Sequence, residues 1–410
     1  MTDRVLVDAI PRIDLASLIE ELKEKSRRSL KEALESYQAR LLDELCGEKR
    51  KPNGIYRRAG SARRPKTIIT SLGVVKFRLL KVKKEATGET MTPILDVLDV
   101  RGRKYTRQVK AECAELTSKL SYGDASEEYN RLTGVLIPKS TIHGFTQKLA
   151  PGMLQAVLNS ATPSQPERQV ILMDGTEVRN VERGGFNQVR VGIGVDETGK
   201  RLLNLTVNQP YQPIPKDSIL ISDGDSALKS QEPWKHQLCI IHAVKRLMFA
   251  LWRERASKEE REYLKAELER VLYTLVNSTR KHSEDGNHHA LRSRIRSTLK
   301  ELSILTAELK HQGYREAAEF LTQNAKLLVT FAELALEGVR IPHTTNQIER
   351  LMGEIAKRCK HHWAHWSDRG LKNILTLILT HYTNPTLYEE YWQNYIHQNQ
   401  INTLQLTTLI

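Results

Sequence analysis

The sequence of 410 residues has a formal net charge of +14 and an apolar content of 40%. A chain of this length can form two or three domains, and its composition excludes the disordered classes. The positive charge is concentrated near the start, because residues 1–110 hold 26 Lys and Arg against 15 Asp and Glu. A concentrated basic segment predicts a polyanionic partner, for which nucleic acid is the commonest candidate.

The cysteines lie far apart, at positions 46, 113, 239 and 359, which is not the spacing of a disulfide framework or of a CxxC zinc knuckle. They therefore predict a reducing compartment. Residues 1–25 carry acids from the third position and lack the apolar core of a signal peptide. The apolar stretch at 371–379 is too short to cross a bilayer. We therefore expect a cytoplasmic protein with no membrane segment.

Residues 14–46 predict one or two amphipathic helices, because leucine and isoleucine recur there at helical spacing after Asp14, a possible N-cap. We assign residues 1–48 to this helical segment. Its expected role is packing or self-association.

A basic region follows from Lys49 to Lys84, with 13 basic residues and no acidic one. Within it, residues 66–82 predict a β-hairpin around Gly73 whose outward side chains are Lys and Arg. Such a ribbon can lie along a phosphate backbone, although the same cations can protect an exposed edge strand. The uninterrupted charge favours DNA contact. The cations that we assign to this contact are Arg57, Arg58, Arg63, Arg64 and Lys66.

Residues 105–120 predict a helix, and residues 121–149 predict two more around Thr133-Gly134. A glycine turn between short helices is typical of a helix-turn-helix, although many helical hairpins look the same. The expected base-facing or phosphate-facing residues are Lys139, Ser140, Thr141 and His143. Residues 49–160 would then form an α+β DNA-binding region.

A polar stretch with two prolines at 161–168 indicates a linker, after which the pattern changes to strands. Strands are predicted at 169–173, 186–195, 202–207, 219–222 and 237–241. Three antiparallel strands followed by two crossover strands are expected of an RNase H-like sheet. Asp174 and Asp223 then lie at the ends of neighbouring strands.

Residues 242–339 predict helix almost throughout, which indicates a helical subdomain at 243–340 inserted into the core. The core would comprise residues 161–242 and 341–382. A helix starting after Thr344 or Thr345 would present Glu349 as a third carboxylate. The tail at 383–410 predicts a docking helix through its aromatic residues Tyr388, Tyr391, Trp392 and Tyr395.

Three carboxylates, Asp174, Asp223 and Glu349, form the expected catalytic set. Oxygen ligands of this kind suit two Mg²⁺ ions, of which one activates the attacking water or hydroxyl and the other stabilises the leaving oxygen. A rival zinc site would use a split set of side chains: Cys239, His242, Cys359 and His361, with His362 and His365 nearby.

Four motifs together resemble the DDE signature of prokaryotic insertion-sequence transposases of the Mutator superfamily. They are Asp174-Gly175, Ser222-Asp223-Gly224, Cys239-x-x-His242 and Asn346-x-x-Glu349-Arg350. In that family a Cys-x-x-His follows the second Asp, and a helical insertion of roughly this length precedes the Glu. The resemblance covers most of residues 50–382, and its motifs are specific in combination but weak one by one.

The resemblance implies an RNase H-like enzyme that cleaves DNA at the ends of a mobile element and joins the freed 3′ hydroxyl to target DNA. Asp174, Asp223 and Glu349 would hold two Mg²⁺ or Mn²⁺ ions per active site, and His242 would contact the scissile phosphate or a leaving oxygen. Other roles would fall to Cys239 and Asn346, which support the site, and to Arg350 and Arg358, which contact DNA.

The implied partners are double-stranded DNA, at element ends and targets, and further copies of the chain in a homodimer or higher homo-oligomer. The implied location is the nucleoid. Two alternatives share these features: a domesticated DNA-binding protein that has lost recombination, and an RNase H-like nuclease. The presence of all three carboxylates favours activity, and a nuclease would not need so large a DNA-binding region.

Overall fold

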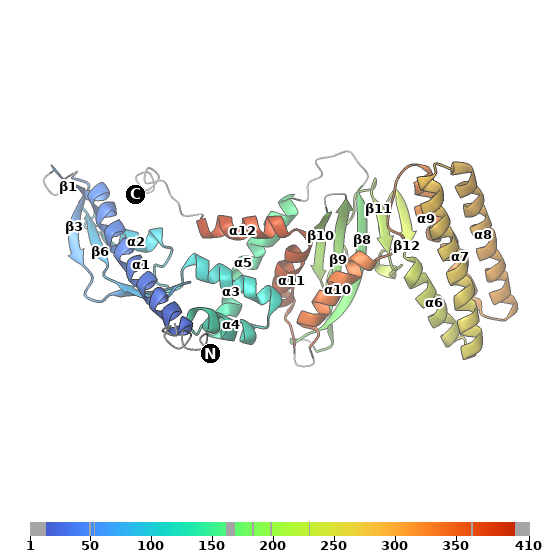
Figure 1. Cartoon of the computed structure of the whole chain (residues 1–410), viewed down its shortest axis with the longest axis horizontal. Coiled ribbons are helices and arrows are strands. Elements are labelled where there is room, and N and C mark those ends of the chain that lie inside the picture. The colour runs from blue at the N-terminus through green and yellow to red at the C-terminus, as the bar shows by residue number, and fades with distance from the viewer. Residues whose placement is uncertain are drawn as a thin grey trace, which may run out of the picture. The chain divides into compact units, whose positions relative to one another are not determined.

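The computed structural model describes residues 14–48, 51–52, 54–160, 169–182, 184–196, 199–228, 230–361 and 364–397. The chain divides into two units, one made of residues 1–149 and 389–410 and the other of residues 150–388. Helices and strands occur in both (Figure 1), which confirms the predicted mixed α/β class. The predicted linker at 161–168 lies outside the described residues.

The first unit begins with one long helix, α1 (Leu15–Cys46), whose N–H group at Ala16 donates to the Asp14 side chain. The C-terminal part of α1 is buried against a small sheet through Leu41 and Leu42. The described strands of this unit are β1 (Gly47–Glu48), β2 (Lys51–Pro52), β3 (Tyr56–Ser61), β4 (Lys66–Thr70), β5 (Gly73–Phe77), β6 (Leu80–Lys84) and β7 (Thr90–Met91).

The predicted basic hairpin is only partly correct. β4 and β5 do form an antiparallel hairpin, which turns just before Gly73. β6, expected in the same ribbon, instead pairs with β3 and β7 in a separate sheet. The exposed positions of β5 are Val74 and Lys76, so its outer face is not continuously basic. The alternation of apolar and polar residues located these strands, but it carries no information about which strands pair.

The helices of the first unit are α2 (Pro93–Val97), α3 (Arg107–Lys119), α4 (Tyr122–Thr133) and the first part of α5 (Lys139–Ser160). α4 ends at Gly134 in the left-handed conformation, as expected for a glycine turn between helices. The docking helix is also present, as α12 (Pro385–His397). Within the first unit, the Tyr391 hydroxyl donates to the Leu149 carbonyl at 2.9 Å, and Arg107 lies over the Tyr395 ring.

Among its described residues, the second unit has a five-stranded sheet in the order β10-β9-β8-β11-β12. The strands are β8 (Val170–Arg179), β9 (Phe186–Asp196), β10 (Gly199–Val207), β11 (Ile219–Ser222) and β12 (Lys235–Leu238). The first three are antiparallel neighbours, whereas β11 runs parallel to both β8 and β12. All five predicted strands are therefore confirmed.

Several strand bounds differ from the prediction: β10 and β12 begin earlier, at Gly199 and Lys235, and two ends near the site also differ. β8 continues past Asp174 to Arg179, because the alternation of an exposed Glu177 with a buried Val178 extends its pairing with β9. β12 ends at Leu238, and Cys239 is the N-cap of the next helix rather than the end of a strand. In both places the end of the apolar run is not the end of the strand.

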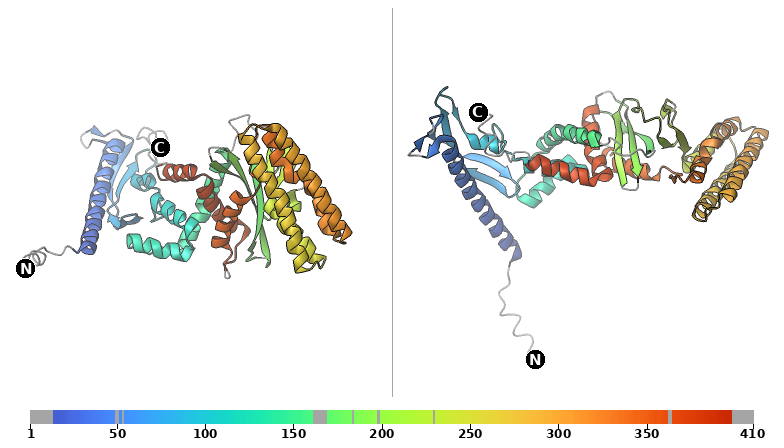
Figure 2. Two further views of the ribbon diagram at one scale, coloured as in Figure 1. Left: turned by 45° about the vertical axis from the view of Figure 1, so that its right-hand side comes forward. Right: turned by 90° about the horizontal axis from the view of Figure 1, so that it is seen from above.

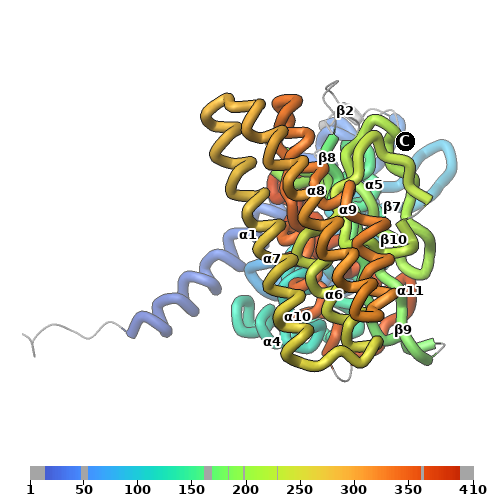
Figure 3. The backbone as a smooth tube through the Cα atoms, turned by 90° about the vertical axis from the view of Figure 1, so that its right-hand side faces the viewer, coloured from blue at the N-terminus to red at the C-terminus, as the bar shows by residue number. Residues whose placement is uncertain are grey.

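The predicted helical subdomain is confirmed as α6 (Ile240–Arg253), α7 (Lys258–Glu284), α8 (His288–His311) and α9 (Arg315–Leu336). Figures 1 and 3 show α7, α8 and α9 side by side, and in Figure 1 they lie beyond β12. α9 is fixed to β12 because Thr330 donates to the His236 carbonyl at 2.9 Å, and the Phe331 N–H donates to Gln237 at 2.7 Å. The subdomain is thus attached to the edge of the sheet.

Two further helices, α10 (Asn346–Cys359) and α11 (Asp368–Thr383), pack against the sheet. α10 contacts β8 and α11 contacts β10, so these red and orange helices lie beside the green strands in Figure 2. The contact with β8 brings the first turn of α10 close to Asp174. None of the helices in the described part of the chain combines the length and apolarity needed to cross a membrane.

The helical subdomain offers a matched test of its packing on α8. Ile295 is 6% exposed and Ile304 is 58% exposed on the same helix. Ile295→Ala should lower the free energy of unfolding by about 2–5 kcal/mol, because it leaves a cavity among apolar side chains. Ile304→Ala should change it by less than about 0.5 kcal/mol. Urea unfolding followed by circular dichroism measures both, and equal effects would contradict this packing.

Candidate active site

Two aspartates meet where β11 ends. The parallel ladder between β8 and β11 has Met173 and Ser222 as its last pair. Asp174 is the next residue in β8 and Asp223 is the first residue after β11, and they are close enough for the charge of Asp223 to act on Asp174. Asp223 lies in the turn after β11, where its Oδ1 accepts a hydrogen bond of 2.9 Å from the Asp225 N–H. The predicted neighbourhood of the two aspartates is thus present.

The pair is electrostatically unfavourable. Burial, and then the negative charge of Asp223, raise the pKa of Asp174 to about 6. Glu349 adds a smaller increase, while the Gly175 N–H and His242 lower the pKa of Asp174 in part. Half-buried carboxylates that repel one another form the environment in which a bound cation is most stabilising.

Glu349 is presented by the first turn of α10 and is fixed by Thr345, the residue before that helix. The Thr345 hydroxyl donates to Glu349 Oε1 at 2.7 Å and lies 3.2 Å from His242 Nδ1. The Thr345 hydroxyl has one proton, which it donates to Glu349, so it accepts a hydrogen bond from His242 Nδ1. Thr345 was expected to cap α10, but its side chain makes no cap bond and instead links α10 to α6.

Cys239 and His242 lie one turn apart at the start of α6. The ligand atoms of Cys239, His242 and Glu349 all lie within 4.8 Å of one another. A hydrogen bond to Cys239 raises the pKa of His242 above its ordinary value. Burial raises the pKa of Cys239, but hydrogen bonds from His242 and Thr345 outweigh burial and leave that pKa lowered. These contacts hold the imidazole beside the carboxylates.

The split zinc site is not formed among the described residues. Cys239 and His242 form a group with Glu349, and neither Cys359 nor His361 belongs to that group. Cys359 is buried at the end of α10, where burial raises the pKa of its thiol to about 12. His365 faces the Asn180 carbonyl at 3.5 Å. The remaining predicted ligands are His361, which is not in the group, and His362, which lies outside the described residues.

Tyr211 is a buried neighbour of the site that sequence reasoning missed, and it packs with Ile171 and Met173 on the face of β8 opposite the Asp174 side chain. It is 5% exposed, and its hydroxyl has no hydrogen-bond partner within the described part of the chain. A Cβ at Gly175 would lie 3.2 Å from that hydroxyl, so glycine after Asp174 lets the phenol approach β8. Burial, Asp225 and the two paired aspartates all raise the pKa of Tyr211. The only signal in the sequence was the glycine beside the first aspartate.

The Asp-Gly turn after β11 has its own steric requirement. Gly224 has a φ of +81°, and a Cβ there would lie 2.8 Å from Leu238 Cδ1. Its N–H donates to the Ser222 hydroxyl at 3.1 Å. Only glycine fits this turn without strain, so the turn and the position of Asp223 are specified together.

A scan against protein-family models found no match, and a search of curated proteins found no similar sequence. The function is therefore inferred from the chemistry of the site.

The cations predicted to contact DNA near the hairpin differ in their surroundings. Arg63 and Arg64 are exposed. Arg57 pairs with Glu85 at 3.2 Å, and Arg58 pairs with Asp43. Lys66 donates to the carbonyl groups of Val100 and Arg103 at 2.9 and 2.5 Å, which ties it to the fold. Arg63 and Arg64 are therefore the two best placed to meet phosphate.

The other predicted DNA contacts lie at the starts of α5 and α10 and near the end of α10. Lys139, Ser140 and His143 are exposed on α5, while Thr141 is half-buried. Arg350 is exposed on α10, as is Asn346, which was predicted to support the site rather than to contact DNA. Arg358 lies over the Trp366 ring at 5.4 Å, a contact within the fold.

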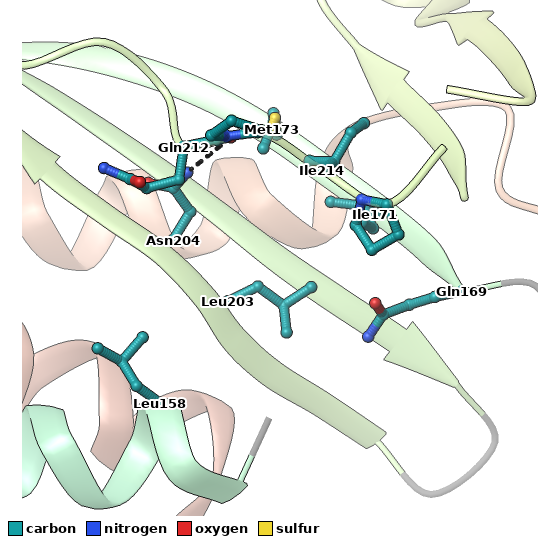
Figure 4. Close-up of a pocket in the computed structure, with 10 residues that line it drawn as sticks. Leu158, Gln169, Ile171, Met173, Leu203, Asn204, Gln212 and Ile214 are labelled. Atoms are coloured by element: carbon teal, nitrogen blue, oxygen red, sulfur yellow. Dashed lines mark hydrogen bonds between the residues drawn. The ribbon is translucent and has the colours of Figure 1, made fainter. Parts of the chain in front are cut away.

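A separate pocket of about 290 Å³ opens between α5 and the sheet (Figure 4). Its lining includes Leu158, Ile171, Met173, Leu203, Asn204 and Gln212. Met173 and Asp174 are consecutive in β8, so their side chains point to opposite faces. The pocket is therefore not part of the carboxylate site.

The raised pKa of Asp174 makes stability depend on pH. Its value of about 6 exceeds the ordinary 3.8, so ionisation destabilises the folded state as the pH rises from 3.8 through 6. Above about pH 7, Asp174→Asn should therefore be more stable than the wild type by up to about 3 kcal/mol. The difference should vanish below about pH 4.

Urea unfolding in EDTA at several pH values measures this difference. Asp217→Asn, in the exposed loop before β11, is the matched control and should show no such trend. A stability difference for Asp174→Asn that does not change with pH would contradict the repulsion.

Proposed function

We propose that this protein is a DDE-type DNA transposase that cleaves strands at insertion-sequence ends and joins them to target DNA. The observation that carries the proposal is the meeting of Asp174 and Asp223 on adjacent parallel strands, with Glu349 presented by α10. The strand order, with three antiparallel strands followed by two parallel ones, supports an RNase H-like core. The helical subdomain between β12 and α10 agrees with the same family.

Mg²⁺ or Mn²⁺, at two ions per active site, would be held by Asp174, Asp223 and Glu349. In favour of these hard cations, the three side chains offer only oxygen, and the raised pKa of Asp174 reports unbalanced negative charge. Among the described residues, however, the ligand atoms within 4.8 Å of Glu349 are those of Cys239 and His242, so an ion shared by all three carboxylates would need them to move closer together. Bound ions supply charge stabilisation at the attacking and leaving oxygens of a phosphodiester.

The side chains around the carboxylates have positioning roles. Thr345 holds Glu349 and His242 in one arrangement through its hydroxyl. The raised pKa of His242 favours its cationic form, which suits contact with a phosphate oxygen. Cys239 fixes the histidine through a hydrogen bond and is itself fully buried, so we assign it no chemical step.

DNA binding is assigned to the first unit. α4 and α5 flank a glycine turn as in a helix-turn-helix, with Lys139, Ser140 and His143 exposed at the start of the second helix. Exposed arginines at positions 63 and 64 add phosphate contacts. Joining two element ends in one reaction requires at least a homodimer, and DNA of this kind would place the protein in the nucleoid.

Loss of the middle carboxylate tests the chemistry. Asp223→Asn should reduce cleavage of a labelled duplex carrying the flanks of the gene by about 100-fold or more, since even supporting residues of a metal site contribute 10–100-fold. Duplex binding should be unchanged, because the substitution is isosteric and lies outside the assigned DNA-binding unit. Gel analysis with Mg²⁺ or Mn²⁺ measures both, and full activity in the variant would refute the assignment.

The same gels separate the alternatives. Products longer than the substrate indicate strand transfer and support a transposase. Shortened products alone indicate a nuclease, and binding without any new product indicates a domesticated DNA-binding protein.

Removal of two exposed arginines tests the DNA-binding unit. Arg63→Ala with Arg64→Ala should reduce the slope of log affinity against log salt by about two units, because each lost phosphate contact removes about 0.9. Arg292→Ala with Arg296→Ala, on the exposed side of α8, removes the same charge and should leave the slope unchanged. Fluorescence anisotropy over a range of salt measures both slopes, and equal losses would point to net charge alone.

A further inference from the structure

An exposed stripe of basic and aromatic side chains runs along α6. Its members are Lys245, Arg246, Phe249, Trp252 and Arg253, all of them exposed. Together with His242 they fall within about one third of the helix circumference at 100° per residue. Because α6 starts at the candidate active site, the stripe begins at His242 and extends about 15 Å along the helix, at 1.5 Å per residue.

The aromatic members are not needed for the fold of α6. Phe249 is 57% and Trp252 is 60% exposed, and their rings stack at a centroid distance of 5.9 Å and an angle of 29°. The opposite face of α6 packs into the helical subdomain through Leu247 and Leu251, both 0% exposed. Exposed aromatic rings next to charged side chains mark a binding surface.

The charges on the stripe are positive and partly unpaired. Lys245 and Arg246 have no carboxylate partner among the residues that the structure describes, whereas Arg253 pairs with Glu316 at 2.9 Å. A Cβ placed on Gly224 would lie 3.7 Å from Arg246 Nη1. The first arginine of the stripe is therefore beside the turn that carries Asp223.

We propose that this stripe, the α6 stripe, binds an unpaired DNA segment next to the phosphodiester that is cut. Phe249 and Trp252 would stack on bases, and Lys245 and Arg246 would contact phosphates. Unpaired bases expose the faces that aromatic rings need, whereas bases in a duplex are stacked on their neighbours. The positive charges of Lys245 and Arg246, which have no carboxylate partner among the described residues, favour a polyanion such as nucleic acid over a protein partner. The proposal rests on the proposed function, because it takes the carboxylate site as the place of cleavage.

The experiment compares two labelled DNAs with the full-length protein in EDTA, where binding is separated from cleavage. One DNA is a duplex throughout, and the other carries the same duplex with a short unpaired thymidine flank. The wild type should bind the flanked DNA more tightly. Phe249→Ala with Trp252→Ala should weaken that binding about tenfold or more and leave duplex binding unchanged, as expected from the loss of base stacking.

Two further variants keep the result interpretable. Trp252→Phe retains an aromatic ring and should retain most of the preference for the flanked DNA. Tyr273→Ala, which removes an aromatic ring that is 46% exposed on α7, is the matched control and should bind both DNAs as the wild type does.

Equal affinity of the wild type for the two DNAs, or unchanged binding by the double alanine variant, would overturn the proposal. It would also be overturned if sedimentation without DNA showed a wild-type multimer and a monomeric double variant, since the α6 stripe would then be a contact between copies. These outcomes do not depend on the result for Asp223→Asn. The proposed function can therefore fail while the α6 stripe still binds unpaired DNA, and the proposal for the α6 stripe can fail while the proposed function holds.

Discussion

The parallel alignment of β8 with β11 is the constraint on which the candidate active site depends. Because Met173 and Ser222 close the ladder, the two following aspartates come together at one end of the pairing, and the charge of Asp223 makes Asp174 harder to ionise. An apolar or neutral hydrogen-bonded pair at this place would make the chain more stable. A cation bound there, as proposed, would offset the repulsion between the like charges.

The helical subdomain begins and ends beside the candidate active site. The Ile240 N–H donates to the His343 carbonyl at 3.2 Å, and the Thr345 N–H lies 3.4 Å from Cys239 Sγ, 106 residues away in the sequence. The two ends of this long excursion are therefore tied together beside the aspartates. The contacts that position His242 and Glu349 are made at these ends, so the site does not depend on the far ends of α7, α8 and α9.

Local patterns in the sequence predicted the elements better than their pairing. Alternation and helical spacing depend on neighbours along the chain, and they located all five strands of the second unit and its helical subdomain. The partner of β6 and the true end of β8 depend on hydrogen bonds to distant strands, which alternation does not encode.

The same distinction between local sequence patterns and distant contacts applies to the candidate site. Asp174, Asp223 and Glu349 could be named because an acid after an apolar strand, or at the start of a helix, is visible in the sequence. Tyr211 could not be named, because its place depends on the missing side chain of Gly175. The second role of Thr345 depends on the approach of α10 to α6, which only the three-dimensional structure shows.

The extension of β8 past Asp174 means that the two aspartates are held in place by different elements. Asp174 is held within a ladder to β9 that continues to Arg179, whereas Asp223 follows the last residue of a four-residue strand and sits in a glycine turn. The position of the first carboxylate thus depends on strand pairing, and that of the second on the hydrogen bonds and the glycine of a short turn. A substitution at Gly224 would therefore displace Asp223 while leaving Asp174 in the sheet.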